Sequence, residues 1–415
     1  MLRRLLLSAA LLLFLAGCVP PPPSTAEPEI LVLWHTFTTT SERNALQILG
    51  DHFNATHPEG ATLIVEYQGN ILEKLEGLPV DQRPDLVVTD ARTASRFGDL
   101  AVALTLPTSL QRDMLPMATS AYATEEEGEL YALPLGLATY VLYYNQVWVR
   151  ELGYRPESIT PEDLLNIACA ATDMEGGQIG LGIPAKPEVL LSLLAAGTVS
   201  LNNGEGGYTL EGDGAMSAAE LGHALLTQGC ARIYEFLDLG VEQFADSSTA
   251  ALIASSLREP EIVQTVLEKR NFTTGITTLP PLTENGGTLW WSRALLLLAP
   301  AGPRREAARE VALWTLSPKA QHVWGERTNF LPVRRSLIEE ERTGQQLRAS
   351  RAALLALTLQ AAEQGTWMTW SPVTDDPQCR TALVRAIFDL NTAQPVKEVL
   401  TAVQATCDSA QEASP

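Results

Sequence analysis

The sequence predicts an α/β protein with a mostly parallel sheet, and three observations support this prediction. Strand-like and helix-like stretches alternate from residue 29 onward. Residues 86–88 read Leu-Val-Val, an apolar run typical of a parallel strand covered on both faces. Two long extended stretches, at residues 128–149 and 288–300, each resemble a crossing between two bodies. The 415 residues are therefore expected to form at least two domains, each built from discontinuous segments.

The first part of the chain is expected to form a strand–helix–strand–helix–strand unit. The predicted elements are strands at residues 29–37, 61–69 and 84–90 and helices at residues 41–54 and 71–78. Leu46, Leu49 and Phe53 give the first helix an apolar stripe. This order predicts parallel strands with right-handed crossovers, and such sheets bind ligands outside the carboxyl ends of their strands. Four side chains suited to binding lie at those ends: Trp34, His35, Tyr67 and Asp90.

The remaining elements continue the alternation, and the chain ends on helices. Pro134 and Gly136 interrupt the first extended stretch. A helix is expected to begin at Thr160, a favourable N-cap that is followed by a proline in the first turn. The glycine-rich residues 204–214 lack the lysine of a phosphate-binding loop, so a hairpin or surface loop is expected there. Further helices are expected at residues 304–316, from 318, and from about 336 to 403 with one interruption.

The N-terminus has the pattern of a bacterial lipoprotein leader. An apolar stretch that is too short to span a membrane closes on LAGC at residues 15–18. This resembles the lipobox, which predicts a signal peptide at residues 1–17 and a lipid on Cys18. A plain signal peptide followed by a chance cysteine is the alternative. The proline-rich residues 18–28 are expected to form a semi-rigid linker.

Export would place the other cysteines outside the reducing cytosol. Four cysteines in that location predict two disulfides, for which three connectivities are possible. We expect the nearest-neighbour pairing, which joins Cys169 to Cys230 and Cys379 to Cys407. These cysteines lack CxxC spacing and the five histidines lack HExxH spacing, so neither a metal site nor a cofactor is expected.

The composition argues against two classes of function. A formal net charge of −20 does not suit nucleic-acid binding, which needs clustered Lys and Arg. The sequence has no GxSxG nucleophile elbow, which argues against a serine hydrolase of that type. Pairs of carboxylates occur in any acidic chain, so their presence does not predict a glycosidase. An exported hydrolase and a surface scaffold remain as alternatives to a binding protein.

Several stretches, taken in order, resemble the family 1 extracellular solute-binding proteins, the sugar-type receptors of ABC importers. They are the leader ending in LAGC, EILVLWHTF, PDLVVTDARTASRFGDL, GELYALPLGLATYVLYYNQVW, FADSSTAALIASS, PLTENGGTLWWSRALLL and VALWTLSPKAQHVWGERTNFLPVR. The resemblance covers nearly the whole chain. Leu252 stands where the family usually has Met, and Ser248-Thr249 stands where it usually has Gly-Lys. The middle of the chain is also less typical of the family.

The resemblance implies a two-lobed, periplasmic-binding-protein-like fold of type II. Each lobe would be a mostly parallel sheet flanked by helices, and a hinge would join the lobes. The boundaries expected are residues 29–135 plus 296–334 for the N-terminal lobe, 136–295 plus 335–407 for the C-terminal lobe, and 408–415 for a tail. Residues 134–136 and 292–293 are expected to act as the hinge, because a few element-terminal residues absorb such rotations.

Sugar recognition needs aromatic platforms and rigid polar groups, because sugars present apolar C–H faces and rims of hydroxyls. The expected ligand-binding residues are Trp34, His35, Tyr67, Asp90, Tyr140, Tyr144, Asn145, Trp290, Trp291, Arg293 and Trp367. Neighbouring strand residues face opposite ways, so one of Trp290 and Trp291 is expected in the core. By the same argument only one of Trp34 and His35 is expected to contact ligand directly. His35 is the expected contact, and Trp34 is expected either to stack on the ligand or to pack just beneath it. Several of the others could equally serve as core or turn residues.

The sequence thus predicts an extracellular receptor that captures a carbohydrate between two lobes and delivers it to the permease subunits of an ABC importer. Glycerol 3-phosphate or a related phosphorylated polyol is the alternative ligand, and Arg293 could bind its phosphate. Ile71, which stands where that subgroup often has Tyr, argues against it. No enzymatic activity is expected. The protein is expected to be a monomer, anchored to the cell membrane through Cys18 and facing the extracellular or periplasmic side.

Overall fold

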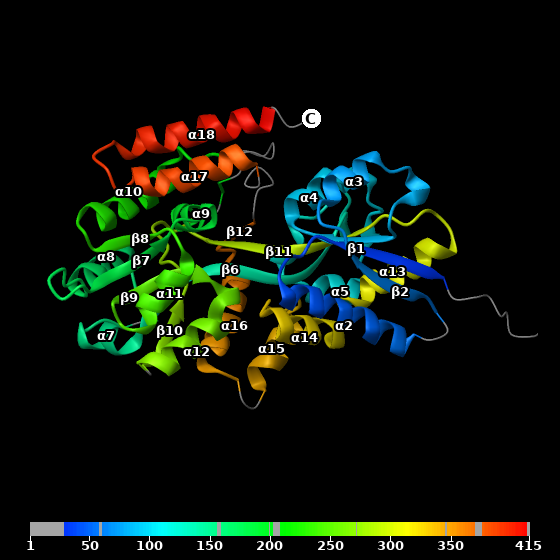
Figure 1. Ribbon diagram of the computed structural model, residues 1–415, viewed down its shortest axis with the longest axis horizontal. Coiled ribbons are helices and arrows are strands. Elements are labelled where there is room, and N and C mark those ends of the chain that lie inside the picture. The colour runs from blue at the N-terminus through cyan, green and yellow to red at the C-terminus, as the bar shows by residue number, and fades with distance from the viewer. Residues whose placement is uncertain are drawn as a thin grey trace, which may run out of the picture.

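The computed structural model describes residues 29–57, 60–155, 159–198, 200–201, 208–270, 272–344, 347–369 and 376–412. Within these ranges the chain folds as a mixed α/β protein with two lobes (Figure 1). The predicted signal peptide, Cys18 and the linker at residues 18–28 lie outside the described residues. None of the described helices combines the length and the apolar character that a membrane crossing requires.

One sheet runs through both lobes. Its hydrogen-bonded order is β2-β1-β3-β11-β6-β9-β7-β8, with β10 also paired to β6 and β12 to β11. The strands of this sheet are β1 (Ile30–His35), β2 (Thr62–Tyr67), β3 (Leu86–Thr89), β6 (Leu133–Asn145), β7 (Ile179–Pro184), β8 (Ala231–Tyr234), β9 (Thr249–Ser255), β10 (Thr274–Thr277), β11 (Thr288–Leu297) and β12 (Trp367–Thr369). A separate pair is formed by β4 (Leu104–Thr105) and β5 (Glu129–Leu130).

The N-terminal lobe is built on β1, β2 and β3, which pair in parallel as predicted. Its helices are α2 (Thr40–Thr56), α3 (Ile71–Gly77), α4 (Ala91–Arg96), α5 (Thr108–Asp113), α6 (Pro116–Thr119), α13 (Pro303–Trp314) and α14 (Pro318–Thr328). Leu46, Leu49 and Phe53 bury the predicted apolar stripe of α2. Helices α3 and α4 lie on one side of the sheet, and α2 and α14 pack together on the other (Figure 1).

The C-terminal lobe is built on β7, β8 and β9, which are also parallel. Its helices are α7 (Gln146–Glu151), α8 (Pro161–Ala170), α9 (Pro187–Ala195), α10 (Asp213–Thr227), α11 (Leu237–Ala245), α12 (Glu259–Lys269), α15 (Arg335–Thr343), α16 (Ala349–Gln364), α17 (Pro377–Asp389) and α18 (Val396–Glu412). The predicted capping box opens α8, because the side chains of Thr160 and Asp163 each accept the other's backbone N–H. Helix α18 continues to residue 412, past the expected boundary at residue 407.

Three segments cross between the lobes: the two extended stretches predicted as crossings, and a third near the expected lobe boundary after residue 334. Strand β6 pairs first with β11 and then, from Tyr140 onward, with β9. Strand β11 pairs with β6 from Trp290 to Leu295, with an irregularity between Ser292 and Ala294, and from Ala294 onward it also pairs with β3 on its other side. The third crossing is the extended chain after α14, where Leu331 exchanges two backbone hydrogen bonds of 2.8 Å with Leu137. The expected boundary after residue 334 implied this change of lobe, whereas the isolated bridge to Leu137 has no periodic signature in the sequence.

Gly136 lies in β6 directly against this third crossing. A Cβ atom at this position would lie 2.6 Å from the Cβ of Phe330 and 2.9 Å from the Nε1 of Trp324, and both of those side chains are fully buried. Substitution therefore forces the packed rings to move.

Gly136→Ala is expected to lower the free energy of unfolding by about 1–3 kcal/mol, the usual range for an overpacked core. The measurement is denaturant unfolding. Gly77→Ala is the control, because nothing lies within 4 Å of a Cβ atom there, and it should be neutral or slightly stabilising. Equal stability of the two variants would contradict the packing of Gly136.

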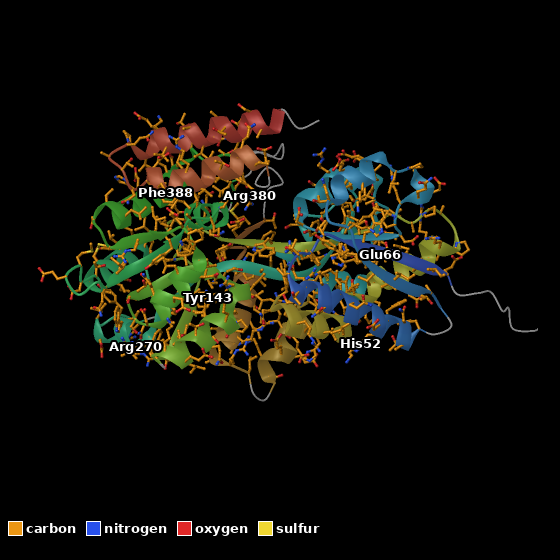
Figure 2. All side chains as sticks on the ribbon, viewed as in Figure 1. His52, Glu66, Tyr143, Arg270, Arg380 and Phe388 are labelled. Carbon is orange, nitrogen blue, oxygen red and sulfur yellow. A yellow bond between two sulfur atoms is a disulfide. The ribbon has the colours of Figure 1, made fainter. Side chains whose placement is uncertain are left out.

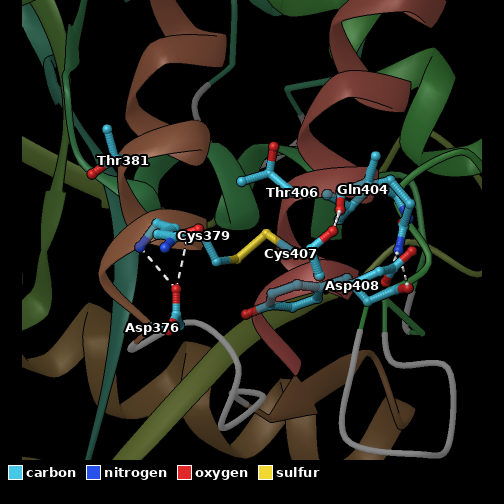
Figure 3. The surroundings of a disulfide bond; sticks show 12 residues. Asp376, Cys379, Thr381, Gln404, Thr406, Cys407 and Asp408 are labelled. Atoms are coloured by element: carbon cyan, nitrogen blue, oxygen red, sulfur yellow. Dashed lines mark hydrogen bonds between the residues drawn. A yellow bond between two sulfur atoms is a disulfide. The ribbon is translucent and has the colours of Figure 1, made fainter. Parts of the chain in front are cut away.

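Both disulfides form with the predicted pairing. Cys169 of α8 is joined to Cys230, which directly precedes β8, and Cys379 of α17 is joined to Cys407 of α18. Figure 3 shows the second bridge between the two helices. The carboxylate of Asp376 caps α17 beside it by accepting the backbone N–H of Cys379 at 3.1 Å. The nearest-neighbour expectation is thus confirmed.

Candidate functional site

The carboxyl ends of β1, β2 and β3 meet at one edge of the N-terminal lobe, as their parallel pairing requires. His35 lies beside Tyr67 in the register, and their ring centroids are 5.6 Å apart. His35 is 4% exposed, whereas Tyr67 is 50% exposed. These strand ends, together with the residues that contact them, are called the N-lobe wall below.

Trp34 and His35 differ in burial, as expected for neighbours on a strand. Trp34 is half-buried, and its Nε1 donates to the Oε2 of Glu66 at 3.0 Å. The Nδ1 of His35 accepts the backbone N–H of Phe37 at 3.2 Å. Of the two side chains, Trp34 is therefore the more exposed, and His35 is held among aromatic rings, which is the reverse of the order of exposure expected from the sequence.

Burial lowers the pKa of His35, and the charge of Arg43 lowers it further, whereas Glu42 raises it. Because the folded-state pKa of His35 lies below the unfolded value, neutral His35 supports stability above about pH 6.5, and this stability is lost as the pH falls through the folded pKa.

The melting temperature of His35→Gln is thus expected to fall less than that of the wild type when the pH is lowered from about 7.5 to about 5.5. His322→Gln, at an exposed histidine, is the control and should behave as the wild type does.

Arg293 forms an ion pair within the N-lobe wall. Its Nε donates to the Oε1 of Glu42 at 2.8 Å, and the side chain of Glu42 is almost fully buried. The guanidinium also lies 4.9 Å from the ring centroid of Phe37 and 5.6 Å from that of Trp291. Trp291 is half-buried and packs edge-on against Phe330. The charge of Arg293 is thus compensated and its position is fixed.

Asp90 caps α4, the alternative role that sequence reasoning had left open. Its carboxylate accepts the backbone N–H of Thr93 at 3.0 Å, and the side chain stays half-buried. The hydroxyl of Tyr122 lies 2.8 Å from the Oγ of Ser292 at the β11 irregularity. Burial raises the pKa of Tyr122, although the hydrogen bond to Ser292 lowers it, so the phenol stays neutral.

The C-terminal lobe offers a second set of strand ends, those of β7, β8 and β9, called the C-lobe wall below. Glu188 of α9 accepts from Arg380 of α17 at 3.0 Å, and Figure 2 labels this arginine. Arg258, which follows β9, donates to Asp238 of α11 at 2.6 Å. Tyr140 is half-buried near these groups, and burial raises its pKa, with Glu188 adding to the rise. The tyrosine therefore offers a neutral hydroxyl.

The other predicted site residues lie mainly in packed positions. Tyr144 and Trp290 are buried, and Asn145 is buried with its Oδ1 accepting the backbone N–H of Val147 at the start of α7. Trp367 is half-buried at the start of β12, paired with Thr288 of β11. Burial of Trp290 and partial exposure of Trp291 agree with the expectation for neighbouring strand residues.

Sequence reasoning missed the carboxylate partners in both walls. Glu42 and Arg293 are 251 residues apart, and Glu188 and Arg380 are 192 residues apart. Glu42 has one feature that the sequence pattern indicates, its place in the first turn of α2. Thr39 is the N-cap of this helix, and its side chain accepts the backbone N–H of Glu42. Pairings over such separations follow from the fold and leave no pattern in the sequence.

A metal site and a surface groove can both be distinguished from the walls. No group of three or more His, Cys, Asp or Glu side chains suited to a metal ion occurs among the described residues. A groove of about 970 Å³ lies where α14, α15 and the start of α16 meet, and none of its lining residues belongs to either wall. This groove is therefore separate from the strand ends.

Comparison with known proteins assigns the family. Residues 49–347 match the family described as bacterial extracellular solute-binding protein. Comparison with curated proteins gives no match.

Solved structures share the fold. The cyclic α-maltosyl-1,6-maltose binding protein from Arthrobacter globiformis has a TM-score of 0.72 at 16% identity, over 92% of this chain and 99% of that one. A cyclo/maltodextrin-binding protein complexed with maltotetraose has a TM-score of 0.73 at 16% identity, over 94% and 99%. UgpB from Mycobacterium tuberculosis, complexed with glycerophosphocholine, has a TM-score of 0.66 at 16% identity, over 93% and 98%. These likenesses establish the two-lobed fold.

Proposed function

Because this chain belongs to the bacterial extracellular solute-binding protein family, we propose that it is the receptor of an ABC importer. It captures a carbohydrate between its two lobes and delivers it to the membrane permease. The observation that carries the proposal is the arrangement of the strands. Carboxyl ends of parallel strands form a wall on each lobe, and three crossing segments join the lobes.

The charges of the two walls favour a neutral ligand. Arg293, Arg258 and Arg380 each contact a carboxylate, so the walls are polar but compensated. A neutral polyhydroxylated solute can bind such walls without separating the ion pairs, whereas a phosphate would compete with carboxylates for the guanidinium groups. The maltotetraose bound by a protein of the same fold supports this choice.

The exposed and half-buried residues of the predicted set are the proposed ligand contacts. They are Trp34, Tyr67, Asp90, Tyr140, Trp291, Arg293 and Trp367. His35 acts from beneath as a neighbour of Tyr67. We assign Tyr144, Asn145 and Trp290 to packing, because their side chains are buried.

The alternative ligand is glycerol 3-phosphate or a related phosphorylated polyol, and the glycerophosphocholine complex of a similarly folded protein supports it. That ligand would have to draw Arg293 away from Glu42. Arg293→Ala would therefore abolish binding of a phosphorylated ligand, whereas binding of a neutral sugar would weaken only modestly.

The remaining parts of the proposal concern cell location and domain limits. The protein is exported, carries a lipid on Cys18, acts as a monomer and catalyses no reaction. The proposed lobes keep the boundaries of residues 29–135 plus 296–334 and 136–295 plus 335–407. The strand β6, which changes partner at Tyr140, supports a hinge near these limits.

A thermal-shift screen tests the proposal. The panel contains neutral mono- and oligosaccharides, polyols, sugar phosphates, glycerol 3-phosphate and glycerophosphocholine. We expect at least one neutral saccharide to raise the melting temperature and to be recovered unchanged after hours of incubation. Loss of the saccharide would indicate an enzyme, a shift with phosphorylated ligands alone would favour the alternative, and no shift at all would refute the proposal.

A further inference from the structure

The turn between β1 and α2 is fixed by a histidine side chain. His35 is the last residue of β1, and its Nδ1 accepts the backbone N–H of Phe37 at 3.2 Å. The side-chain oxygen of an asparagine makes the same contact in an Asx-turn. Because Nδ1 is the acceptor, the neutral ring must carry its proton on Nε2. The path of the chain into α2 therefore depends on the protonation of one ring.

Phe37 connects this turn to β11, a strand that crosses between the lobes. Its side chain is 3% exposed, and the guanidinium of Arg293 lies 4.9 Å from its ring centroid, where a cation is attracted to the aromatic face. Arg293 belongs to β11, and its Nε donates to Glu42 in the first turn of α2 at 2.8 Å. A shift of the turn would therefore disturb the contact between Phe37 and Arg293.

A second proton on the ring of His35 does not fit these surroundings. It would turn Nδ1 into a donor that faces another donor, and the charge would lose most of its hydration because the residue is 4% exposed. On α2, the charge of Arg43 opposes this proton and that of Glu42 favours it. Tyr67 faces the ring from β2, and β3 places the apolar Val88 beside it in the register.

Lobe closure would make a charged His35 still less favourable. On the proposed function, closure over a ligand expels water from the N-lobe wall. The ligand-bound protein then holds the neutral ring more strongly, so a protonated protein must release its proton on binding. Affinity therefore falls as the pH falls through the pKa of His35 in the free protein, by at most about tenfold per pH unit for one proton released.

We propose that His35 is the positioning residue of the N-lobe wall, whose neutral ring sets the turn between β1 and α2 and whose protonation loosens that turn and weakens ligand capture. The effect on capture rests on the proposed carbohydrate function. The effect on the turn does not, because it follows from the contact between His35 and Phe37 alone.

Amide hydrogen exchange without ligand tests the effect on the turn. Wild type, His35→Asn, His35→Ala and His322→Gln are compared at about pH 7.5 and about pH 5, with each rate divided by that of an unstructured peptide. Asn keeps an acceptor that does not titrate, Ala has none, and His322 is an exposed control. The amide of Leu33, which pairs with β2 and β3, reports whether the lobe stays folded.

We expect exchange at Phe37 in wild type and His322→Gln to rise about tenfold at the lower pH. It should stay slow at both pH values in His35→Asn and be fast at both in His35→Ala. Exchange at Leu33 should be slow in every case. A merely structural role for the ring would give a loss in His35→Ala without any dependence on pH in wild type.

Isothermal titration at the same two pH values tests the effect on capture. The probe is maltotetraose, and if it gives no heat, the saccharide with the largest thermal shift replaces it. We expect wild type to bind about three- to tenfold more weakly at the lower pH and to release a proton there, as buffers of different ionisation enthalpy report. His35→Asn should bind equally well at both pH values and release none.

The outcomes separate this inference from the proposed function. Exchange at Phe37 that does not change with pH in wild type would overturn the inference, whatever the ligand. Wild-type affinity that does not change with pH, or an equal loss in His35→Asn, would overturn the role of His35 in capture. A protein that binds no saccharide would overturn the proposed function and the effect on capture, and exchange at Phe37 would still decide the effect on the turn.

Discussion

Replacing Asp85 with Ala is expected to lower the free energy of unfolding by about 2–4 kcal/mol, because the backbone N–H of Val32 loses its acceptor and Arg304, whose side chain is 41% exposed, loses its charged partner. The carboxylate of Asp85 is fully buried. It accepts the backbone N–H of Val32 at 2.8 Å and the Nη2 of Arg304 at 2.8 Å. The substitution leaves both donors without this acceptor.

Asp85 lies where β1, β11 and α13 meet, and the substitution to Ala removes its side-chain contacts but keeps its backbone contacts. Its backbone oxygen accepts the N–H groups of Leu298 and Ala299, which directly follow β11. Through Val32 and Arg304 it also joins β1 to α13. Asp85 thus links β1, β3 and β11. The candidate site lies at the other end of β1 and β3, where their carboxyl ends meet.

Denaturant unfolding measures the effect of Asp85→Ala. Glu363→Ala is the matched control, because Glu363 pairs with Arg335 at 3.0 Å on the surface. Surface pairs contribute about 0–1 kcal/mol, so the control should lose little stability. A similar loss for both variants would show that burial of Asp85 does not determine its contribution.

Removing the α17–α18 disulfide by Cys379→Ser with Cys407→Ser is expected to cost about 3–4 kcal/mol of stability, because the bridge closes a loop with a sequence separation of 28. The bridge also holds the first turn of α17 (Figure 3). In the same turn Arg380 contacts Glu188 in the C-lobe wall. We therefore expect ligand affinity to fall as well.

The other disulfide provides the matched control. Cys169 and Cys230 join the end of α8 to the amino end of β8, away from the strand ends of the C-lobe wall. Replacing both with Ser should lower stability by a comparable amount, about 4 kcal/mol for a separation of 61, and should leave ligand affinity unchanged in the folded protein. Equal loss of affinity in the two variants would contradict the role given to α17.

The sequence predicted best those features that leave a local pattern. The apolar stripe of α2, the parallel strands β1 to β3 and the capping box of α8 all follow from periodicity or helix-cap chemistry. The disulfide pairing was also predicted, since only three connectivities were possible. Convergence of the first three strand ends followed from their order alone.

The features that depend on distant segments could not be predicted in the same way. The sequence suggested Arg293 as a phosphate ligand, but its neutralisation by Glu42 requires knowledge of how α2 meets β11. The isolated bridge between Leu137 and Leu331 in the third crossing also leaves no pattern in the sequence.

Small-angle X-ray scattering tests most directly the claim that a carbohydrate is captured between the lobes. The measurement compares the free protein with the protein saturated by the saccharide that gives the largest thermal shift. If the ligand bridges the two walls, the lobes close on it, and the radius of gyration should fall and reach its limit at one ligand per chain. An unchanged radius of gyration at saturation would place the ligand outside the space between the lobes and would contradict the account.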